Sequence, residues 1–567
     1  RRATATLQAT IFAGCALLGF GCSNTESSPA NAPPIPAGAQ PWFQECADAR
    51  SLTFIHESGH TDRYLMPEIM CGGVALFDMD NDGDLDVYLV QGGTVVPSAN
   101  EQLPGNMLFA NDGSGSFTDI SDSSGADDSG YGMGVTVGDY DNDGDPDLYV
   151  TNLGPNVLLR NDGSGVFTDV TDLANVGHGG WGASAAFLDY DNDGDLDLFV
   201  TNYLNWSPAT EIECYKRAGG LDYCSPANYY APPVDVLYQN NGDGVFTDVS
   251  ESAGLLEAFG TGLGVICADF NMDGRTDIFV ANDGMPDQLW INQGDGTFRD
   301  EAMLRGVAID MTGAAKAGMG VAVADLDDDR DPDLLVVNLR NETDSFYRNE
   351  GSYFADRTAE IGLANTSRPF TRFGLGFVDF DNDGRLDLYQ ANGRVSRFTE
   401  LYTNDPFAEP NLLYRGTAGG QLEEVLPRGG TAELLAATSR GAAFGDIDND
   451  GRIDILIVNR DHRAHLLRNT VTNSGHWITL RLVNEHGSDA IGATVHFTVG
   501  DRTITRYARI ASSYFSANDP RVHCGLGEAA TVDQIEVRWP DATVETFGPQ
   551  NADQFLMLTK GTGSPAE

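Results

Sequence analysis

Basic side chains are scarce in this sequence, because 34 Lys and Arg residues stand against 84 Asp and Glu residues and give a formal net charge of −50. Binding to nucleic-acid phosphates requires clustered Lys and Arg. We therefore expect no nucleic-acid partner, and an anionic membrane surface would repel the chain. Hydrophobic residues still make up 41 % of the sequence, and the aspartates fall in tight clusters. This composition predicts a folded protein with sites for hard cations rather than a disordered acidic chain.

Familiar catalytic and metal motifs are also rare. The chain lacks a C-x-x-C pair and a G-x-S-x-G turn, which argues against a zinc ribbon, a dithiol redox centre and a hydrolase of the nucleophile-elbow type. His56–His60 does match H-E-x-x-H, but that motif requires a helix to place both histidines on one face. Here it follows the strand-like Leu52–Ile55, and Gly59 weakens any helix. We expect a turn at this place and no enzyme activity from the motif.

The apolar runs are too short to cross a bilayer as a mature helix. The run Ile11–Gly21 follows two Arg residues and precedes Cys22, which predicts an export signal over residues 1–22. The small residues before Cys22 resemble a bacterial lipoprotein signal, with Cys22 lipidated as a membrane tether. Cys15 is the weaker candidate, and an ordinary cleaved signal is the alternative. Residues 23–41 predict a flexible linker, and the protein is expected to be periplasmic, anchored at the outer membrane or extracellular.

Six cysteines follow the export signal, and export makes disulfides possible. Cys214 and Cys224 lie in one long insert and are expected to pair. Cys46 and Cys71 are a plausible second pair. Cys267 lies in an apolar strand pattern and is expected to be a buried thiol.

The dominant feature is a nine-residue loop of pattern D-x-[DN]-x-D-G-x-x-D. It occurs seven times, once imperfectly, at Asp78, Asp139, Asp189, Asp269, Asp325, Asp379 and Asp446. Apolar strands flank each loop, and a third strand, a Gly turn and an aromatic strand follow. Seven four-stranded units without long helices predict an all-β fold, a seven-bladed β-propeller over residues 42–470. The fourth-strand pattern is missing after the seventh loop but occurs at Phe43–Asp48, so the N-terminal strand is predicted to close the last blade.

Each loop concentrates oxygen donors, which suits Ca²⁺ better than Mg²⁺ because Ca²⁺ accepts six to eight ligands in irregular geometry. We expect side chains at positions 1, 3, 5 and 9 to coordinate, and position 7 to offer its carbonyl, since position 7 alternates between Asp and Arg. Position 12 is not acidic and no helix follows, which excludes EF-hands. Solvated turns are the alternative, but clustered aspartates would repel one another without a cation.

The sequence therefore predicts up to seven Ca²⁺ ions. The predicted ligands are Asp78, Asp80, Asp82, Asp84 and Asp86; Asp139, Asp141, Asp143, Asp145 and Asp147; Asp189, Asp191, Asp193, Asp195 and Asp197; Asp269, Asn271, Asp273, Arg275 and Asp277; Asp325, Asp327, Asp329, Asp331 and Asp333; Asp379, Asp381, Asp383, Arg385 and Asp387; and Asp446, Asp448, Asp450, Arg452 and Asp454. In the fifth loop Arg330 replaces the glycine of position 6. A side chain at positive φ is strained, so we expect this ion to be held more weakly.

These loops resemble the FG-GAP/VCBS repeat family, which includes the integrin α-subunit propellers. The resemblance implies calcium on one face of the ring and partner binding elsewhere. Residues 471–567 lack such loops. Stretches such as Trp477–Leu482, Asp489–Val495 and Ile535–Pro540 look like the ASPIC/UnbV domain that follows such propellers in the cartilage acidic protein family. Cys524 stands where an aromatic residue is expected. The resemblance predicts a small C-terminal β domain, which a protease would release by cutting near residues 471–475.

We expect an interaction module that binds a protein or a glycan. A carbohydrate-active enzyme such as a polysaccharide lyase is one alternative, and a structural component of a surface assembly is another. The longest insert, Tyr203–Val234, combines a predicted disulfide with the aromatic residues Trp206, Tyr215, Tyr223, Tyr229 and Tyr230. Such a loop suits recognition, although its aromatic side chains could equally cover the edge of a blade.

Overall fold

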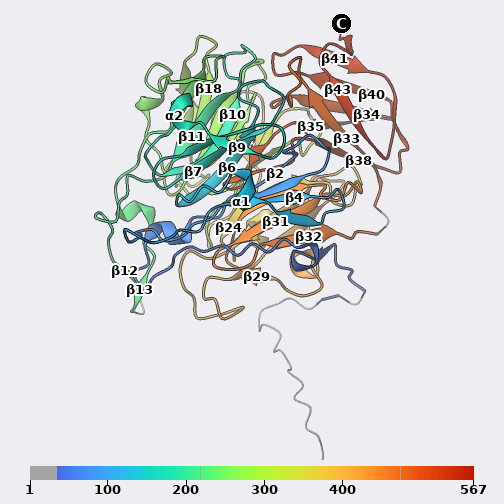
Figure 1. Cartoon of the computed structure of the whole chain (residues 1–567). Coiled ribbons are helices and arrows are strands. Elements are labelled where there is room, and N and C mark those ends of the chain that lie inside the picture. Colours follow the sequence, from blue (N-terminus) through green and yellow to red (C-terminus); the bar gives the residue numbers. More distant parts are fainter. Residues whose placement is uncertain (1–34, 37, 217–218, 473, 567) are drawn as a thin grey trace, which may run out of the picture. The chain divides into compact units, whose positions relative to one another are not determined.

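The computed structural model describes residues 35–36, 38–216, 219–472 and 474–566 (Figure 1). The predicted export signal, with Cys15 and Cys22, lies outside these residues. Among the described residues, the helices are too short or too polar to cross a membrane. Four one-turn α-helices connect strands in the ring, namely α1 (Ser121–Ser124), α2 (Thr171–Ala174), α3 (Ala302–Arg305) and α4 (Leu363–Thr366). Most of the remaining regular structure is β-strand.

Seven antiparallel sheets, numbered 1 to 7 along the chain, make up the larger part of the structure. Sheets 1 to 3 contain β2 (Val74–Phe77), β3 (Asp86–Leu89), β4 (Met107–Asn111) and β5 (Phe117–Asp119); β6 (Gly132–Gly138), β7 (Asp147–Asn152), β8 (Val157–Asn161) and β9 (Phe167–Asp169); and β10 (Gly182–Leu188), β11 (Asp197–Asn202), β14 (Val236–Asn240) and β15 (Phe246–Asp248).

Sheets 4 to 7 repeat this order. They contain β16 (Gly262–Ala268), β17 (Asp277–Asn282), β18 (Gln288–Asn292) and β19 (Phe298–Asp300); β20 (Val321–Ala324), β21 (Asp333–Val336), β22 (Ser345–Asn349) and β23 (Phe354–Asp356); β24 (Arg372–Val378), β25 (Asp387–Asn392), β27 (Leu412–Gly416) and β28 (Leu422–Glu424); and β30 (Ser439–Gly445), β31 (Asp454–Asn459), β32 (His465–Asn469) and β1 (Phe43–Glu45).

The N-terminal strand closes the ring as predicted. β1 pairs antiparallel with β32, so that Phe43 lies opposite Asn469 and the first strand of the chain becomes the outer strand of sheet 7. The innermost strands of successive sheets lie side by side, and β2 of sheet 1 contacts both β6 and β30. The fold prediction, an all-β seven-bladed propeller followed by a small β domain, is therefore confirmed.

The inner strands are apolar because each sheet packs between two neighbours. β3, β7 and β11 are buried along their whole length, which matches the near-continuous apolar runs of strands covered on both faces. Six of the seven outer strands begin with a buried phenylalanine, as in β9, where Phe167 is buried and the next two residues are exposed, and β28 begins with the buried Leu422. This buried anchor explains why the fourth-strand pattern is readable from sequence.

The C-terminal residues form a separate apolar core. One sheet contains β38 (Val522–Gly527), β33 (His476–Val483) and β43 (Gln554–Thr559), and a second contains β35 (Arg502–Tyr507), β34 (Thr494–Val499), β40 (Gln534–Arg538), β41 (Val544–Phe547) and β44 (Ser564–Pro565). The larger of these strands gather in red in Figure 1. Two short strands, β39 (Thr531–Val532) and β42 (Gln550–Asn551), complete this β domain.

A hairpin of the C-terminal domain enters the centre of the ring. Its strands are β36 (Ala511–Ser512) and β37 (Ser516–Ala517), and β37 adds in parallel to β2 of sheet 1. Ser513 exchanges two backbone hydrogen bonds with Val321 of sheet 5, at 2.9 and 2.7 Å. The hairpin is thus hydrogen-bonded to strands from opposite parts of the ring.

Two aromatic residues at the tip of this hairpin fill the central channel. Tyr514 and Phe515 are at most 1 % exposed and belong to one apolar core with residues of several inner strands, including Phe373. The Tyr514 hydroxyl donates a 2.9 Å hydrogen bond to the Met70 carbonyl. Cleavage near residues 471–475 is therefore not expected to release the C-terminal part while the ring is folded.

The cysteine predictions have mixed outcomes. Cys214 and Cys224 form a disulfide as predicted. Cys46 and Cys71 are free thiols, so the second predicted pair is wrong. The physical reason is that they belong to different cores, Cys46 under sheets 1 and 7 and Cys71 in the central channel. Cys267 is free and half-buried.

Candidate metal-binding loops

Each Asp-rich loop joins the first two strands of its sheet, and its backbone makes a sharp turn through two left-handed residues. Position 4 has positive φ in all seven loops, for example 59° at Asn81, and position 6 has φ values such as 93° at Gly83. Asn and Gly are the residues that adopt this region at least cost. Arg330 holds φ 80° at position 6 of the fifth loop, so the expected positive φ of this side chain is confirmed, and the weaker hold on the ion stays a prediction.

Carboxylates hold the turn from within. In the sixth loop Asp379 accepts hydrogen bonds from the amides of Asp383 and Gly384, at 3.0 and 2.8 Å. Asp383 in turn accepts one from the Arg385 amide at 3.0 Å. The bond from position 7 to position 5 recurs in all seven loops. The loop backbone is therefore organised around its own aspartates, and their oxygens are drawn to a common centre.

Three carboxylates converge in several loops, with one oxygen of each within 4.8 Å of the others. The groups include Asp78, Asp80 and Asp82; Asp139, Asp141 and Asp147; Asp189, Asp191 and Asp197; Asp325, Asp327 and Asp329; and Asp379, Asp381 and Asp387. Members of the predicted ligand sets thus meet in space. Several buried oxygens in these loops also have no hydrogen-bond partner among the residues that the structure describes, namely Oδ1 of Asp84, Asp141, Asp189, Asp331, Asp381 and Asp448.

Such orphaned carboxylate oxygens fit a hard cation, because a buried charged acceptor without a partner is costly. Burial raises the pKa of Asp86 to about 8. Burial and the nearby Asp82 raise the pKa of Asp84 to about 7. Both shifts have the same physical meaning, since the folded loop disfavours these negative charges in the absence of a counter-charge. A divalent ion bound by the oxygens would supply it.

The aspartate at position 9 has a second task, which sequence reasoning missed. In sheet 2 Asp147 accepts the amide of Tyr140, at loop position 2, at 3.2 Å, and the amide of Asn161, at the end of the third strand, at 2.8 Å. The same pair of bonds occurs in all seven sheets. Position 9 therefore clamps the loop to the body of its sheet.

Six asparagines extend this clamp to the neighbouring sheet, and we call them the asparagine ladder. Its members are Asn111, Asn161, Asn240, Asn292, Asn349 and Asn469. Each side chain donates to the carbonyl at position 8 of its own loop and to the carbonyl at position 2 of an adjacent loop. Asn111 reaches Ile447 of sheet 7 at 2.9 Å, across the closure of the ring. In sheet 6 Gly416 takes this place and supplies only its amide.

Position 7 behaves in two ways. The arginines Arg275, Arg385 and Arg452 turn back and pair with the aspartate at position 5 of their own loops. In the first loop Asp84 instead keeps a buried, unpartnered oxygen. The coordination predicted for positions 1, 3, 5 and 9, and for the carbonyl of position 7, stays a prediction.

The C-terminal domain covers the face of the ring on which the Asp-rich loops lie, which the sequence did not reveal. Its side chains reach six of the seven loops. The contacts are Arg481 with Asn81, Ser488 with Asp139, Arg538 with Asp269, Arg502 with Asp328, His523 with Asn382, and Arg521 with Asn449. Four of these six side chains are arginines. The domain therefore brings positive charge to the loops in which the acidic charge is concentrated.

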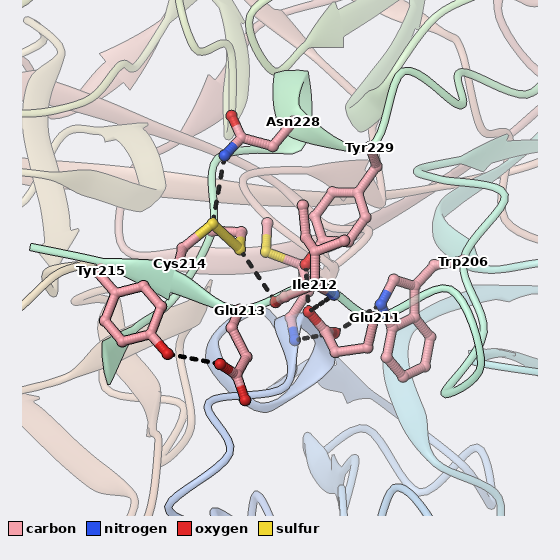
Figure 2. Close-up of a disulfide and its surroundings, with 10 residues drawn as sticks. Trp206, Glu211, Ile212, Glu213, Cys214, Tyr215, Asn228 and Tyr229 are labelled. Atoms are coloured by element: carbon pink, nitrogen blue, oxygen red, sulfur yellow. Dashed lines mark hydrogen bonds between the residues drawn. A yellow bond between two sulfur atoms is a disulfide. The ribbon is translucent and has the colours of Figure 1, made fainter. Parts of the chain in front are cut away.

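The long insert lies on the other side of the ring. Its hairpin of β12 (Cys214–Tyr215) and β13 (Leu221–Asp222) projects in Figure 1 away from the red C-terminal strands. Figure 2 shows Glu211 as its anchor, because this carboxylate accepts hydrogen bonds from Trp206 Nε1 and the Tyr229 hydroxyl, both at 2.7 Å. The insert is thus fixed by buried polar contacts as well as by its disulfide.

The aromatic residues of the insert fall into a buried pair and an exposed pair. Trp206 and Tyr223 are buried in the central core and cover the channel. Tyr215 and Tyr230 are 64 % and 89 % exposed. The buried pair therefore packs in the core, and a recognition role for the exposed pair stays a prediction.

The H-E-x-x-H segment is not helical, as expected. Gly59 has φ 62°, and the two histidines have different surroundings. His56 is 1 % exposed, and neither of its ring nitrogens has a partner. His60 Nδ1 lies 2.8 Å from Glu68 Oε2. The helical geometry that a zinc protease motif requires is absent from this segment.

Comparison with protein families agrees with the repeated geometry. The family described as FG-GAP-like repeat matches residues 78–150, 139–200, 227–280, 269–336 and 325–389, together just over half of the chain. The chain belongs to the FG-GAP-like repeat family. The family described as ASPIC and UnbV matches residues 484–565. Both resemblances predicted from sequence are confirmed, and the structure adds a seventh repeat at Asp446 beyond the matched ranges.

Curated relatives of this FG-GAP-like repeat protein include cartilage acidic protein 1 of Homo sapiens, 28 % identical over 300 residues, with 52 % of this chain and 43 % of that protein covered. The Xenopus tropicalis protein of the same name is 27 % identical over 314 residues, with 53 % and 45 % covered. The chain thus spans less than half the length of the curated relatives it matches.

Solved structures similar to this chain include the lectin BP39L from Burkholderia pseudomallei, at 10 % identity and a TM-score of 0.44, with 71 % of this chain and 98 % of that chain covered. An Agrocybe aegerita lectin that recognises non-reducing terminal N-acetylglucosamine matches at 15 % identity and a TM-score of 0.37, with 69 % and 86 % covered.

The role of the asparagine ladder predicts that alanine substitutions at two adjacent asparagines lower the stability by very different amounts. Asn240→Ala removes side-chain hydrogen bonds to the Tyr140 and Leu196 carbonyls, at 2.7 and 3.1 Å, and should lower the free energy of unfolding by about 2–3 kcal/mol. Asn241→Ala serves as the control, because its side chain bonds only to Val245 and Thr247 of the same exposed turn, and it should lower this free energy by less than about 1 kcal/mol. Denaturant unfolding measures both. Equal effects of the two variants would contradict the role of the ladder.

Substitutions at position 6 are expected to change the stability in opposite directions in two of the loops. Arg330→Gly relieves a side chain at φ 80° and should stabilise the calcium-loaded protein by about 1–2 kcal/mol. Gly194→Ala places a side chain at φ 92° in the third loop, where the nearest atom lies 4.0 Å from the new Cβ, so it adds backbone strain without a clash and should destabilise. Thermal unfolding in saturating calcium measures both. A destabilised Arg330→Gly protein would show that the arginine contributes more than its backbone costs.

Proposed function

We propose that this chain is an exported, calcium-binding β-propeller that acts as an interaction module for a protein or glycan partner. The convergent, partly orphaned carboxylates of the loops support the calcium sites. When bound, Ca²⁺ supplies positive charge at the centre of each loop. The aspartates at positions 1, 5 and 9 then both hold the turn and present the oxygens. Export and a tether at Cys22 rest on the sequence of residues 1–22.

The observation that carries the interaction role is the division between the two sides of the ring. The C-terminal domain contacts the Asp-rich loops, which leaves the insert side for a partner. There Tyr215 and Tyr230 expose their rings on a segment held by the Cys214–Cys224 disulfide. Rigid, exposed aromatic side chains are typical anchors of binding surfaces.

Removal of calcium is expected to destabilise the whole ring. An ion present at 100 times its dissociation constant stabilises the folded state by about 2.7 kcal/mol, and several sites act together here. Excess chelator should therefore lower the melting temperature by about 10 °C or more. Restoring Ca²⁺ should reverse the effect, while equimolar Mg²⁺ should not. An unchanged melting curve, or the absence of bound calcium in elemental analysis of the purified protein, would contradict the metal assignment.

A binding screen tests the interaction role. The protein should bind a glycan or a surface protein in an array, and Tyr215→Ala or Tyr230→Ala should weaken that binding by about tenfold, a change of 1.4 kcal/mol. Leu173→Ala, at a 77 % exposed apolar side chain outside the insert, is the control and should leave binding unchanged. A parallel depolymerisation assay should show intact polysaccharide. Cleavage of any polysaccharide by the wild-type protein would instead favour the carbohydrate-active enzyme.

A further inference from the structure

Arg509 is a charged residue without a counter-charge. It lies between β35 and the hairpin that enters the ring, and among the described residues it forms no hydrogen bond or ion pair. Its Nε and Nη1 atoms are buried without partners. The guanidinium carbon lies 4.2 Å from the centre of the Tyr507 ring. Such stacking compensates only part of the cost of removing a cation from bulk water, which amounts to several kcal/mol.

The acidic and thiol groups around Arg509 do not neutralise it. Asp269 is the carboxylate that acts on it most strongly, but Asp269 is already paired with Arg538 at 3.3 Å and accepts two amides of its own loop. The nearby Cys267 is a free thiol, which carries no charge at neutral pH. Burial lowers the pKa of Arg509 itself to about 10, which still leaves it protonated at neutral pH.

A cavity of about 160 Å³ borders Arg509. It lies between the innermost strands of sheets 4 to 7 and the C-terminal segment 505–523. Arg506 and Tyr507 border it as well, and Arg506 Nε and the Tyr507 hydroxyl also lack partners. A second cavity of about 70 Å³ touches Tyr507 and Arg509. The unpartnered groups of these three residues can all donate a hydrogen bond.

We propose that this cavity binds a small monovalent anion of the halide class, held by Arg509 with Arg506 and Tyr507. Three carboxylates also line the cavity, but Asp325 and Asp379 accept amides of their own loops, and Asp519 is paired with Arg521 at 2.9 Å. The donors that remain unused match a ligand that only accepts hydrogen bonds, and the charge of such a ligand balances the Arg509 guanidinium. The volume accommodates a halide together with ordered water, since one water occupies about 30 Å³ of liquid. Water alone would satisfy the donors but would leave the charge uncompensated.

The anion would join two parts of the molecule. The cavity is walled by the ring on one side and by the C-terminal segment on the other, so a bound anion stabilises the docked hairpin. This site does not depend on the Asp-rich loops for ligands, because its donors are all in β35 and the residues that follow it. The predicted calcium ligands Asp325 and Asp379 do line the same cavity, so the anion is tested in saturating calcium, where the state of the loops stays constant.

A crystal grown or soaked in sodium bromide tests the site directly. The wild-type protein should show an anomalous bromide peak within about 3.5 Å of an Arg509 guanidinium nitrogen. Arg509→Met should lack this peak while keeping the same fold. A cavity that contains only water, or bromide only at exposed surface residues, would overturn the proposal.

Solution measurements give the same test without a crystal. At equal ionic strength and saturating calcium, the wild-type protein should melt about 2 °C or more higher in sodium chloride than in sodium gluconate, a much larger anion. Arg509→Met should lose this difference and Arg509→Lys should keep part of it. Arg299→Met, at an exposed arginine of β19, should retain the full difference. Equal melting of the wild-type protein in the two salts, or an undiminished difference in Arg509→Met, would refute the site. If Arg509→Met fails to fold, the bromide crystal of the wild-type protein decides.

Discussion

A single buried carboxylate in each sheet connects local structure, ring assembly and the candidate metal loops. The aspartate at position 9 fixes the start of the loop with one oxygen and the end of the third strand with the other, as Asp147 does for Tyr140 and Asn161. The asparagine at that strand end then reaches the loop of the preceding sheet. Because a cation in the loop would be held by the same aspartates, occupation of the loops and closure of the ring are energetically linked.

This arrangement concentrates negative charge at buried positions, where it destabilises the folded state unless a positive charge compensates it. Burial raises the pKa of Asp86 and Asp333 to about 8, so that each ionised loop destabilises the metal-free protein. Two sources of positive charge are matched to this need. One is the proposed calcium, and the other is the set of arginines from the C-terminal domain, such as Arg481 and Arg521, that reach the loops. The seven loops contain 32 of the 84 Asp and Glu residues, so a large share of the acidic composition belongs to one face.

Repetition made much of the fold predictable. Seven copies of a local pattern identified the loops and the four strands of each sheet, and the displaced fourth-strand pattern at Phe43 identified the closure. Contacts between segments far apart in sequence left no such pattern. Asn161 looks like an ordinary turn residue, and Tyr514 and Phe515 look like part of a surface strand, although the two aromatic residues fill the channel. The pairing of Cys46 with Cys71 failed for the same reason, because their separation into two cores depends on the closed ring.

The filled channel constrains where a partner can bind. Tyr514 and Phe515 enter the central core with the C-terminal hairpin, and Trp206 and Tyr223 of the long insert belong to the same core. The centre of the ring is therefore packed with side chains rather than open to a ligand. The C-terminal domain also contacts most of the Asp-rich loops, and for this reason the proposed recognition surface is the rim of the insert side. There the exposed Tyr230 stands on the same disulfide-held segment as the buried Tyr223. Core packing and the proposed recognition thus involve different aromatic residues of one insert.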